Sequence, residues 1–551
     1  MKKYGFYFLL CLVLIVSGCN KVSQNEIDET NADAYAVARL FCDVSFWQAP
    51  AWNTTPGTIT GDISAATGLA LEFDVPSVNA DTQLSFHLIN NDLPDIISLT
   101  DTASIRKLAN SGKVWEIDEF LRRYRPDSHI LVDFPEDAKK TLIERDGAWY
   151  AYPSHLDSMD ARATWKGITA FYDDTADYRS NYAIIWNKSM LETLGLSVEE
   201  LQTEEQVLSA FKTAKGRLVN GREIIPLLLD GTDYFTSTQY FLLSTFGAEY
   251  VNNEGNYRHV ILQPEARQAL YFVNQCLRNG YADPEQLMYE NVKIKEYIAS
   301  GRVLCFIGNI ANTDMRPSEW VSSGVILSSK GDSPVFGRNM GAVPNWIGWI
   351  HTFISKDCRN PEEIAAWLDY VTSEEGLTLW YFGYEGIHFN YDGDGLIVVT
   401  PEWRAAINDY SQTGIGSLWM VDNTAWKYSK QPPPKPGSGG MFMAEISIAF
   451  GSHPKTRSYD SSLLYFPGEN LLPDSEYGII EKNIMDWQKK QIPVLIMSEN
   501  DVEFEAQYQI FMSNFETLGI NKLDEKINEF YQINCINSGR VIERVNGAND
   551  D

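Results

Sequence analysis

The sequence predicts an α/β protein that is built around more than one hydrophobic core. Short apolar runs bounded by Gly, Pro or Asp alternate with helical stretches, which is the order that βα units produce. The chain of 551 residues is 44% apolar and 13% aromatic, and a single core rarely grows beyond about 300 residues. We therefore expect two or more cores with mostly parallel sheets flanked by helices.

The first part of the chain justifies this prediction segment by segment. A polar, acidic stretch over 19–36 lacks periodicity and is typical of a flexible tether. The first strand candidate, 40–47, ends in Trp47. Strands and helices then alternate: a strand at 69–75, a helix at 80–91, a strand at 93–99, and helices at 104–110 and 117–124.

The second part repeats the alternation. We expect strands at 182–186 and 303–307, and helices at 188–194, 204–217, 264–279, 361–371 and 374–382. Gly195, Gly280 and Gly383 are C-terminal stop signals for three of these helices. The Pro- and Gly-rich stretch 431–440 predicts a long surface loop, with a linker between domains as the alternative. We find no internal repeat.

The first nineteen residues have the pattern of an export signal. Lys2 and Lys3 precede an apolar run over 4–16, which Ser17, Gly18 and Cys19 follow. The run is shorter than the roughly 20 residues that a spanning helix needs, and this layout is typical of a cleaved signal peptide over 1–18. Its ending resembles the bacterial lipobox, in which Cys19 is acylated and begins the mature chain. The alternatives are an ordinary signal with a chance cysteine, or an uncleaved anchor.

Charge and cysteine content limit the partners. Removal of residues 1–18 changes the formal net charge from −29 to −31. Because such a chain repels nucleic acid and anionic headgroups, neither is predicted as a general partner. Five cysteines remain beyond Cys19, without CxxC spacing. We expect buried thiols, or one or two disulfides at most, and no zinc site.

Catalytic and metal signatures are scarce. The seven histidines include no i,i+4 pair, and neither a GxSxG elbow nor a phosphate-binding GxxxxGK[ST] loop occurs. The stretch 392–395 (DGDG) lacks the remaining ligands of a calcium loop, so we interpret it as a tight turn. A pair of carboxylates for glycoside hydrolysis stays open, because such residues meet in space and not in sequence.

Aromatic residues occur where predicted strands end and loops begin. This set comprises Trp47, Trp52, Tyr152, Tyr234, Trp346, Trp349 and Trp426. In open α/β sheets, ligands bind outside the carboxyl ends of strands. Flat rings at that place suit the apolar face of a pyranose, while Asp, Asn and Glu bind its hydroxyls. The alternative for any single ring is core packing, because Trp and Tyr are mostly buried.

Four stretches then follow one another in the order of a known family. Residues 147–153 (GAWYAYP) are similar to a G-K-x-Y-A/G-x-P hinge segment, and 182–188 (YAIIWNK) to a strand-to-helix Y-N-K-D motif. Residues 300–309 resemble a G-K/R-A-A-M…G segment, and 360–376 a late pair of helices. Together they resemble the family 1 extracellular solute-binding lipoproteins of ABC sugar importers, in particular the long Gram-positive subgroup.

The resemblance implies a two-lobed fold of the periplasmic-binding-protein type (type II), with mixed or parallel sheets, flanking helices and a hinge. It implies an N-terminal lobe of 37–150 plus 336–392 and a C-terminal lobe of 151–335 plus 393–551. Residues 400–551 match no motif of the family. The sequence departs from the family pattern at two places. Ile310 stands where the family has a Trp, and 158–178 is similar to an insertion. The identity of the ligand is therefore not inferred from the resemblance.

The resemblance also implies a set of ligand-binding residues and no catalytic residue, metal or cofactor. The set is Trp47, Asp101, Tyr152, Asp157, Tyr234, Asn309, Trp346, Trp349 and Trp426. The implied protein is a monomer, held by the lipid on Cys19 to the extracytoplasmic face of the cell membrane. It would capture an oligosaccharide and deliver it to ABC permease subunits. A glycan-active hydrolase and a ligand-sensing lipoprotein remain alternatives.

Overall fold

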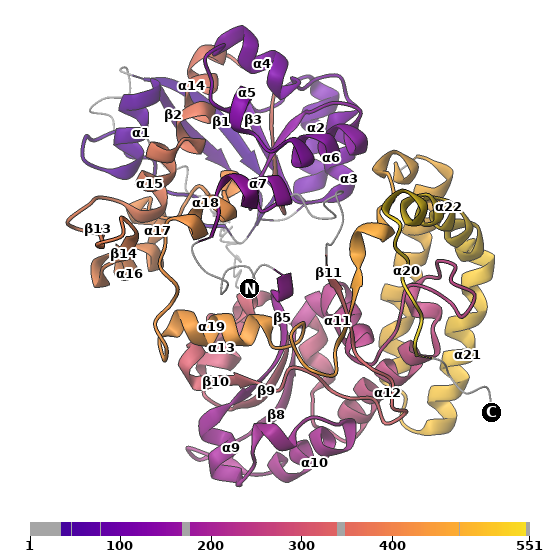
Figure 1. Cartoon of the computed structure of the whole chain (residues 1–551). Helices are drawn as coiled ribbons and strands as arrows, with labels where there is room; N and C mark the ends of the chain where they lie inside the picture. The colour runs from indigo at the N-terminus through magenta and orange to yellow at the C-terminus, as the bar shows by residue number, and fades with distance from the viewer. Residues whose placement is uncertain are drawn as a thin grey trace, which may run out of the picture.

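Two β-sheets organise the chain, each inside its own hydrophobic core. The computed structural model describes residues 35–546 except 46, 78, 168–176, 339–347 and 473. In Figure 1 the two sheets lie one above the other, and helices cover both. The described residues include no helix that is long and apolar enough to cross a membrane.

The first sheet has five strands in the order β2-β1-β3-β12-β4. Their bounds are β1 Ala36–Cys42, β2 Leu69–Asp74, β3 Ile96–Leu99, β4 Ala151–Pro153 and β12 His351–Ile354. The helices around it are α1 Ile59–Thr67, α2 Ala80–Asn90, α3 Thr102–Ala109, α4 Ile117–Tyr124, α5 Ile130–Asp133, α6 Glu136–Asp146, α7 Met159–Thr164, α14 Pro361–Thr372 and α15 Glu374–Phe382. Ile364, Trp367, Leu368 and Val371 share the buried face of α14.

The second sheet has four strands in the order β10-β5-β9-β8. The strands are β5 Tyr182–Asn187, β8 Ile225–Leu229, β9 Val303–Asn309 and β10 Trp320–Ser322. Its helices are α9 Lys188–Leu194, α10 Glu204–Ala214, α11 Ser237–Thr245, α12 Pro264–Arg278, α13 Asn291–Ala299 and α19 Gly439–Ile448. Pro264 opens α12, where its missing N–H costs nothing.

The sheets are mixed, and the expectation of mostly parallel pairing is wrong. Strand β1 runs parallel to β2 and β3, and β8 parallel to β9. However, β12 is antiparallel to both of its neighbours, and β5 is antiparallel to β9 and β10. The physical reason is that β5 and β12 enter their sheets from the other core, so no helical crossover within one sheet fixes their direction.

The described elements pass from one core to the other at three places along the chain. It passes from β4 to β5, returns from the second sheet to β12, and leaves again between α18 Thr424–Ser429 and α19. The third connection is the Pro-rich stretch, which has no regular structure over 431–438. The stretch lies outside helices and strands, as predicted, but it joins the two cores and is therefore the linker that was the alternative to a long surface loop.

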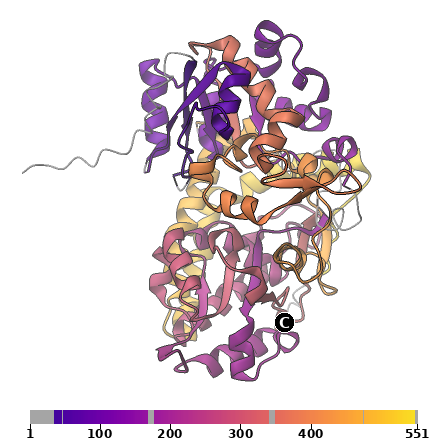
Figure 2. The same cartoon turned by 90° about the vertical axis from the view of Figure 1, so that its left-hand side faces the viewer.

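The elements after α15 divide between the cores at that loop. Four short elements precede α18. They are the hairpin of β13 Phe389–Tyr391 and β14 Ile397–Val399, followed by α16 Pro401–Asn408 and α17 Tyr410–Thr413. Ile397, Ile415, Leu418 and Trp426 belong to the first core, whereas the sequence grouped all of 393–551 with the second lobe. Figure 2 shows this orange segment at mid-height.

Three long helices complete the second core: α20 Glu476–Ile496, α21 Asp501–Leu518 and α22 Ile520–Ser538. Ile492, Phe504 and Phe511 pack in the same cluster as the second sheet. The segment that precedes these helices contacts the first core, because Arg106 on α3 donates to the carbonyl of Leu471 at 2.9 Å. Strands β11 Val335–Arg338 and β15 Arg457–Asp460 pair parallel, and β6 Leu218–Val219 pairs with β7 Arg222–Glu223.

The described cysteines contain no disulfide. Cys42, Cys276, Cys305 and Cys535 are buried as free thiols, and Cys358 is partly buried. This agrees with the expectation of buried thiols.

Candidate functional site

The strand registers define the edge of each sheet that lies next to the connections. His351, the first residue of β12 after the second connection, pairs with Leu99 and Pro153. The carboxyl ends of β3 and β4 therefore lie at that edge. In the second sheet, Tyr182 begins β5 and pairs with Asn309, the last residue of β9. We call these two the hinge-facing edges.

Carboxylates occupy the hinge-facing edge of the first sheet. Asp43 accepts hydrogen bonds from the N–H of Thr100 at 2.7 Å, its hydroxyl at 3.0 Å and the N–H of Asp101 at 3.0 Å. Asp101 caps α3 by accepting from the N–H of Ser104 at 2.7 Å. Burial raises the pKa of Asp43, and the nearby charge of Asp101 adds to this shift.

The second hinge-facing edge is organised around Asp230, whose side chain is fully buried. It accepts from the N–H of Asn309 at 2.7 Å, the hydroxyl of Thr238 at 2.9 Å and the Asn312 amide at 3.0 Å. The same amide donates to Asp233 at 2.7 Å. Burial raises the pKa of Asp230 to about 6. Asn309 is thus held at the strand end, half-buried.

Two parallel indole rings lie beside the start of β12. Trp349 is 40% exposed and stacks on Trp419, with ring centroids 5.5 Å apart and planes 7° from parallel. Trp419 is half-buried and meets the ring of Trp47 edge-on at 5.9 Å. We call Trp349 and Trp419 the tryptophan platform. The exposed part of Trp349 is an aromatic surface of the kind that a pyranose ring covers.

A chain of alternating charges connects the first core with the start of the second. Asp157 binds Arg162 through two hydrogen bonds of 3.0 and 3.2 Å, and it lies 3.8 Å from Arg179. Asp177 lies 3.8 Å from Arg162 and forms an ion pair with Arg338 on β11. We call these five residues the hinge charge chain. It links side chains of both cores.

His155 and Asp422 lie beside this chain. His155 has a left-handed backbone, with φ at 51°, a conformation that clusters at functional sites. Its Nε2 lies 3.6 Å from Asp422. Burial lowers the pKa of His155, so the imidazole is neutral at pH 7. The backbone also ties the two segments, because Leu156 donates to the carbonyl of Asp422 at 3.0 Å.

The structure distributes the predicted site residues unevenly. Trp349, Asp101, Asp157 and Asn309 lie at the hinge-facing edges or in the hinge charge chain. The rings of Trp47, Tyr152, Tyr234 and Trp426 are at most 3% exposed. This differs from the prediction that they offer a face to a ligand, because apolar neighbours cover them in the two cores. Trp346 and Cys19 lie outside the described residues.

Sequence reasoning missed several residues of the region. Trp419, His155, Arg162, Arg179, Arg338 and Asp422 carry no motif. Trp419 is far from the hinge segment in sequence and reaches it only because 397–426 packs on the first core. The sequence feature that could have indicated Trp419 is that it is a tryptophan in a segment without predicted helix or strand.

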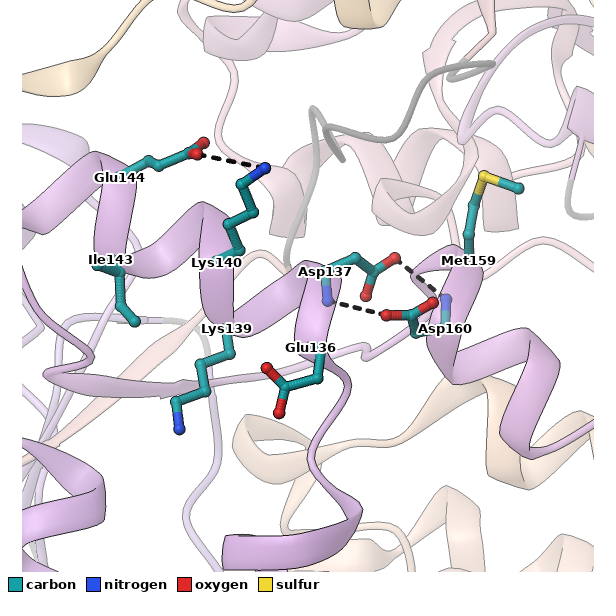
Figure 3. A pocket seen from close by; sticks show the side chains of 8 residues that line it. All are labelled: Glu136, Asp137, Lys139, Lys140, Ile143, Glu144, Met159 and Asp160. Atoms are coloured by element: carbon teal, nitrogen blue, oxygen red, sulfur yellow. Dashed lines mark hydrogen bonds and ion pairs between the residues drawn. The ribbon is translucent and has the colours of Figure 1, made fainter.

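A separate open pocket of about 800 Å³ lies between α6 and α7. Figure 3 shows Asp137 and Asp160 facing each other there. Each carboxylate accepts the backbone N–H of the other residue, at 3.0 and 3.1 Å. Among the described residues that line this pocket there is no aromatic ring and none of the predicted site residues. Across the described ranges, no group of three or more His, Cys, Asp or Glu is arranged to hold a metal ion.

Comparison with known proteins identifies the fold. No family model matches the sequence. The chain is 18% identical over 448 residues to the polygalacturonan/rhamnogalacturonan-binding protein YtcQ of Bacillus subtilis, covering 77% of this chain and 82% of that protein. Among solved structures, the ABC-transporter substrate-binding protein FusA of S. pneumoniae in complex with kestose gives a TM-score of 0.65. The two sequences are 15% identical, and the alignment covers 91% of this chain and 100% of the FusA chain.

A solute-binding protein from Bifidobacterium longum infantis, described as binding HMO and associated with an ABC transporter, gives a TM-score of 0.61. Its identity is 14%, over 91% of this chain and 99% of that chain. The predicted two-lobed α/β fold is confirmed: the chain has the fold of the extracellular solute-binding proteins of ABC sugar transporters.

Proposed function

We propose that this chain is the lipid-anchored binding component of an ABC importer, and that it captures an oligosaccharide and delivers it to permease subunits. The observation that supports this most directly is the tryptophan platform at a hinge-facing edge between two cores. The relatives whose names specify a saccharide ligand, YtcQ and FusA, point to the same class of ligand.

Capture requires the two hinge-facing edges to approach each other around the ligand. A pyranose stacks on the exposed part of the Trp349 ring, while Asp101 and Asn309 offer polar groups to its hydroxyls from opposite sheets. A ligand shifts the equilibrium between open and closed forms only by its higher affinity for the closed form. Contacts made from both sheets at once supply that difference, because they exist only after closure.

Delivery depends on the anchor and on a receptor that recognises the closed form. The lipid on Cys19 keeps the protein at the membrane surface. A permease that binds the closed form better than the open form receives loaded protein in preference to empty protein.

The test is a titration of intrinsic tryptophan fluorescence and melting temperature against a panel of oligosaccharides. A ligand that binds the folded state must raise the melting temperature by mass action. We expect both signals to respond to at least one saccharide without its turnover. If no saccharide changes either signal, the proposal is wrong. Cleavage of the saccharide would instead favour the hydrolase, and binding without permease stimulation would favour the sensor.

A further inference from the structure

The charge of the ligand is the question that the comparisons leave open. The relatives include a protein named for polygalacturonan, a polymer of carboxylated sugars, and a complex with kestose, an uncharged sugar. The charged groups of the described hinge region decide between the two classes. They fall into arginines that already have partners and carboxylates that form no ion pair with Lys or Arg among the described residues.

The arginines of the hinge charge chain are already engaged. Asp157 accepts two hydrogen bonds from Arg162 and lies 3.8 Å from Arg179. Asp177 pairs with Arg338, and Arg179 also donates to the hydroxyl of Tyr428. Arginine recognises a carboxylate best through its paired N–H groups. A ligand carboxylate would therefore have to displace a protein carboxylate from each of these arginines.

The hinge-facing edges, by contrast, carry carboxylates whose partners are neutral. Asp43 and Asp101 bind N–H and hydroxyl groups, and Asp230 and Asp233 bind N–H, hydroxyl and amide groups. No ion pair joins these four to Lys or Arg among the described residues. A ligand carboxylate near them would meet repulsion that Arg106 offsets only beside Asp101.

The remaining charged groups near the platform reduce this excess of negative charge but do not cancel it. Asp422 lies 3.6 Å from His155, which burial keeps neutral at pH 7, and it also interacts electrostatically with Arg179. Lys427 lies over the ring of Tyr381, with its ammonium 4.9 Å from the ring centre, and it keeps its positive charge there. Carboxylates with neutral partners remain good acceptors for sugar hydroxyls, which are donors.

We infer that the site selects uncharged oligosaccharides and rejects those that carry uronic acids. This inference rests on the proposed function and specifies its ligand class. The pre-paired arginines deny a uronate its usual partner, and the edge carboxylates repel it. The exposed carboxylate of Asp101 accepts hydrogen bonds from the hydroxyls of a neutral sugar.

The test compares matched ligands by titration calorimetry at pH 7.5. One arm contains neutral oligosaccharides, including fully methyl-esterified oligogalacturonides, and the other contains the same oligogalacturonides as free acids together with alginate oligomers. We expect binding in the neutral arm and at least 10-fold weaker binding in the acidic arm. An acid that binds as tightly as the best neutral ligand overturns this inference alone. Absence of binding in both arms overturns the proposed function as well.

A variant arm tests the pairing itself. Asp157→Asn removes the charge that holds Arg162 and Arg179, so the ratio of acidic to neutral affinity should rise several-fold. Asp118→Asn is the matched control, because it removes a carboxylate that lies 3.9 Å from Lys139 on the first core. If the Asp157→Asn variant has a much lower melting temperature than the parent, the Asp177→Asn variant takes its place, because that substitution removes the partner of Arg338. An unchanged ratio in a folded variant contradicts the inference.

Discussion

At the scale of single residues, exposure separates Trp349 from the other predicted rings. Trp349 is 40% exposed, whereas Trp47, Tyr152, Tyr234 and Trp426 are at most 3% exposed. Sequence position alone placed all five at strand ends. Whether a ring faces solvent depends on which distant segment packs over it, and that information is not local.

The first prediction concerns Trp349→Ala. Stacking of an aromatic ring contributes about 0.5–1.5 kcal/mol beyond the buried area, so we expect roughly 10-fold weaker saccharide binding. Calorimetry with the best ligand of the panel measures this loss. Tyr391→Ala, which removes another exposed ring, on the β13 hairpin, is the control and should bind as the parent does. Equal affinities for the Trp349 variant and the parent would contradict a role for the platform.

Asp230 gives a prediction about pH. Its folded-state pKa of about 6 lies above the ordinary value of 3.8. Asp230 therefore stabilises the fold most below pH 3.8, and this contribution is lost as the pH rises through 6. A shift of two units corresponds to about 3 kcal/mol. We expect the difference in free energy of unfolding between the parent and Asp230→Asn to fall by about that amount between pH 3.5 and 7. Urea denaturation at each pH measures it, and a constant difference would rule it out.

At the scale of elements, most helices and strands followed from periodicity and stop signals. The predicted helices 117–124, 188–194 and 374–382 have the bounds that the structure shows. The directions of the strands could not be predicted in this way. They depend on β5 and β12 entering their sheets from the other core, which no local sequence pattern reveals. The packing of 397–426 on the first core was also unpredictable, since those short segments carry no family motif.

Gly348 provides a prediction about the second connection. Its φ is 95°, and a Cβ there would lie 1.9 Å from the carbonyl oxygen of Ser154. Gly348→Ala must push the two connecting segments apart and move Trp349. We expect a loss of stability well above the roughly 1–2 kcal/mol that a left-handed conformation costs, together with weaker saccharide binding.

The matched control for that variant is Gly112→Ala. Gly112 also has a positive φ, 72°, but a Cβ there meets nothing within 4 Å. It should lose only the conformational cost and keep its ligand affinity. Thermal unfolding and calorimetry compare the two variants. Equal losses for both would show that contact with Ser154 is unimportant.

At the scale of the whole molecule, the proposed anchor predicts where the protein is found. Cys19→Ala removes the thiol that the lipid would modify, so we expect the protein to move from the membrane fraction to the soluble extracytoplasmic fraction. Metabolic labelling with a fatty acid and cell fractionation measure this. Purified Cys19→Ala protein should bind saccharide as the parent does. Retention of label and membrane association in the variant would exclude Cys19 as the anchor.

The position of β12 also constrains the order in which the chain can fold. β12 lies between β3 and β4, yet it begins at His351, nearly two hundred residues after β4 ends. While the chain is being synthesised, β4 has no strand to pair with until residue 354 has emerged. The five-stranded sheet therefore stays incomplete until the second connection has been synthesised, and β4 meets its partner strand only late in the synthesis of the chain.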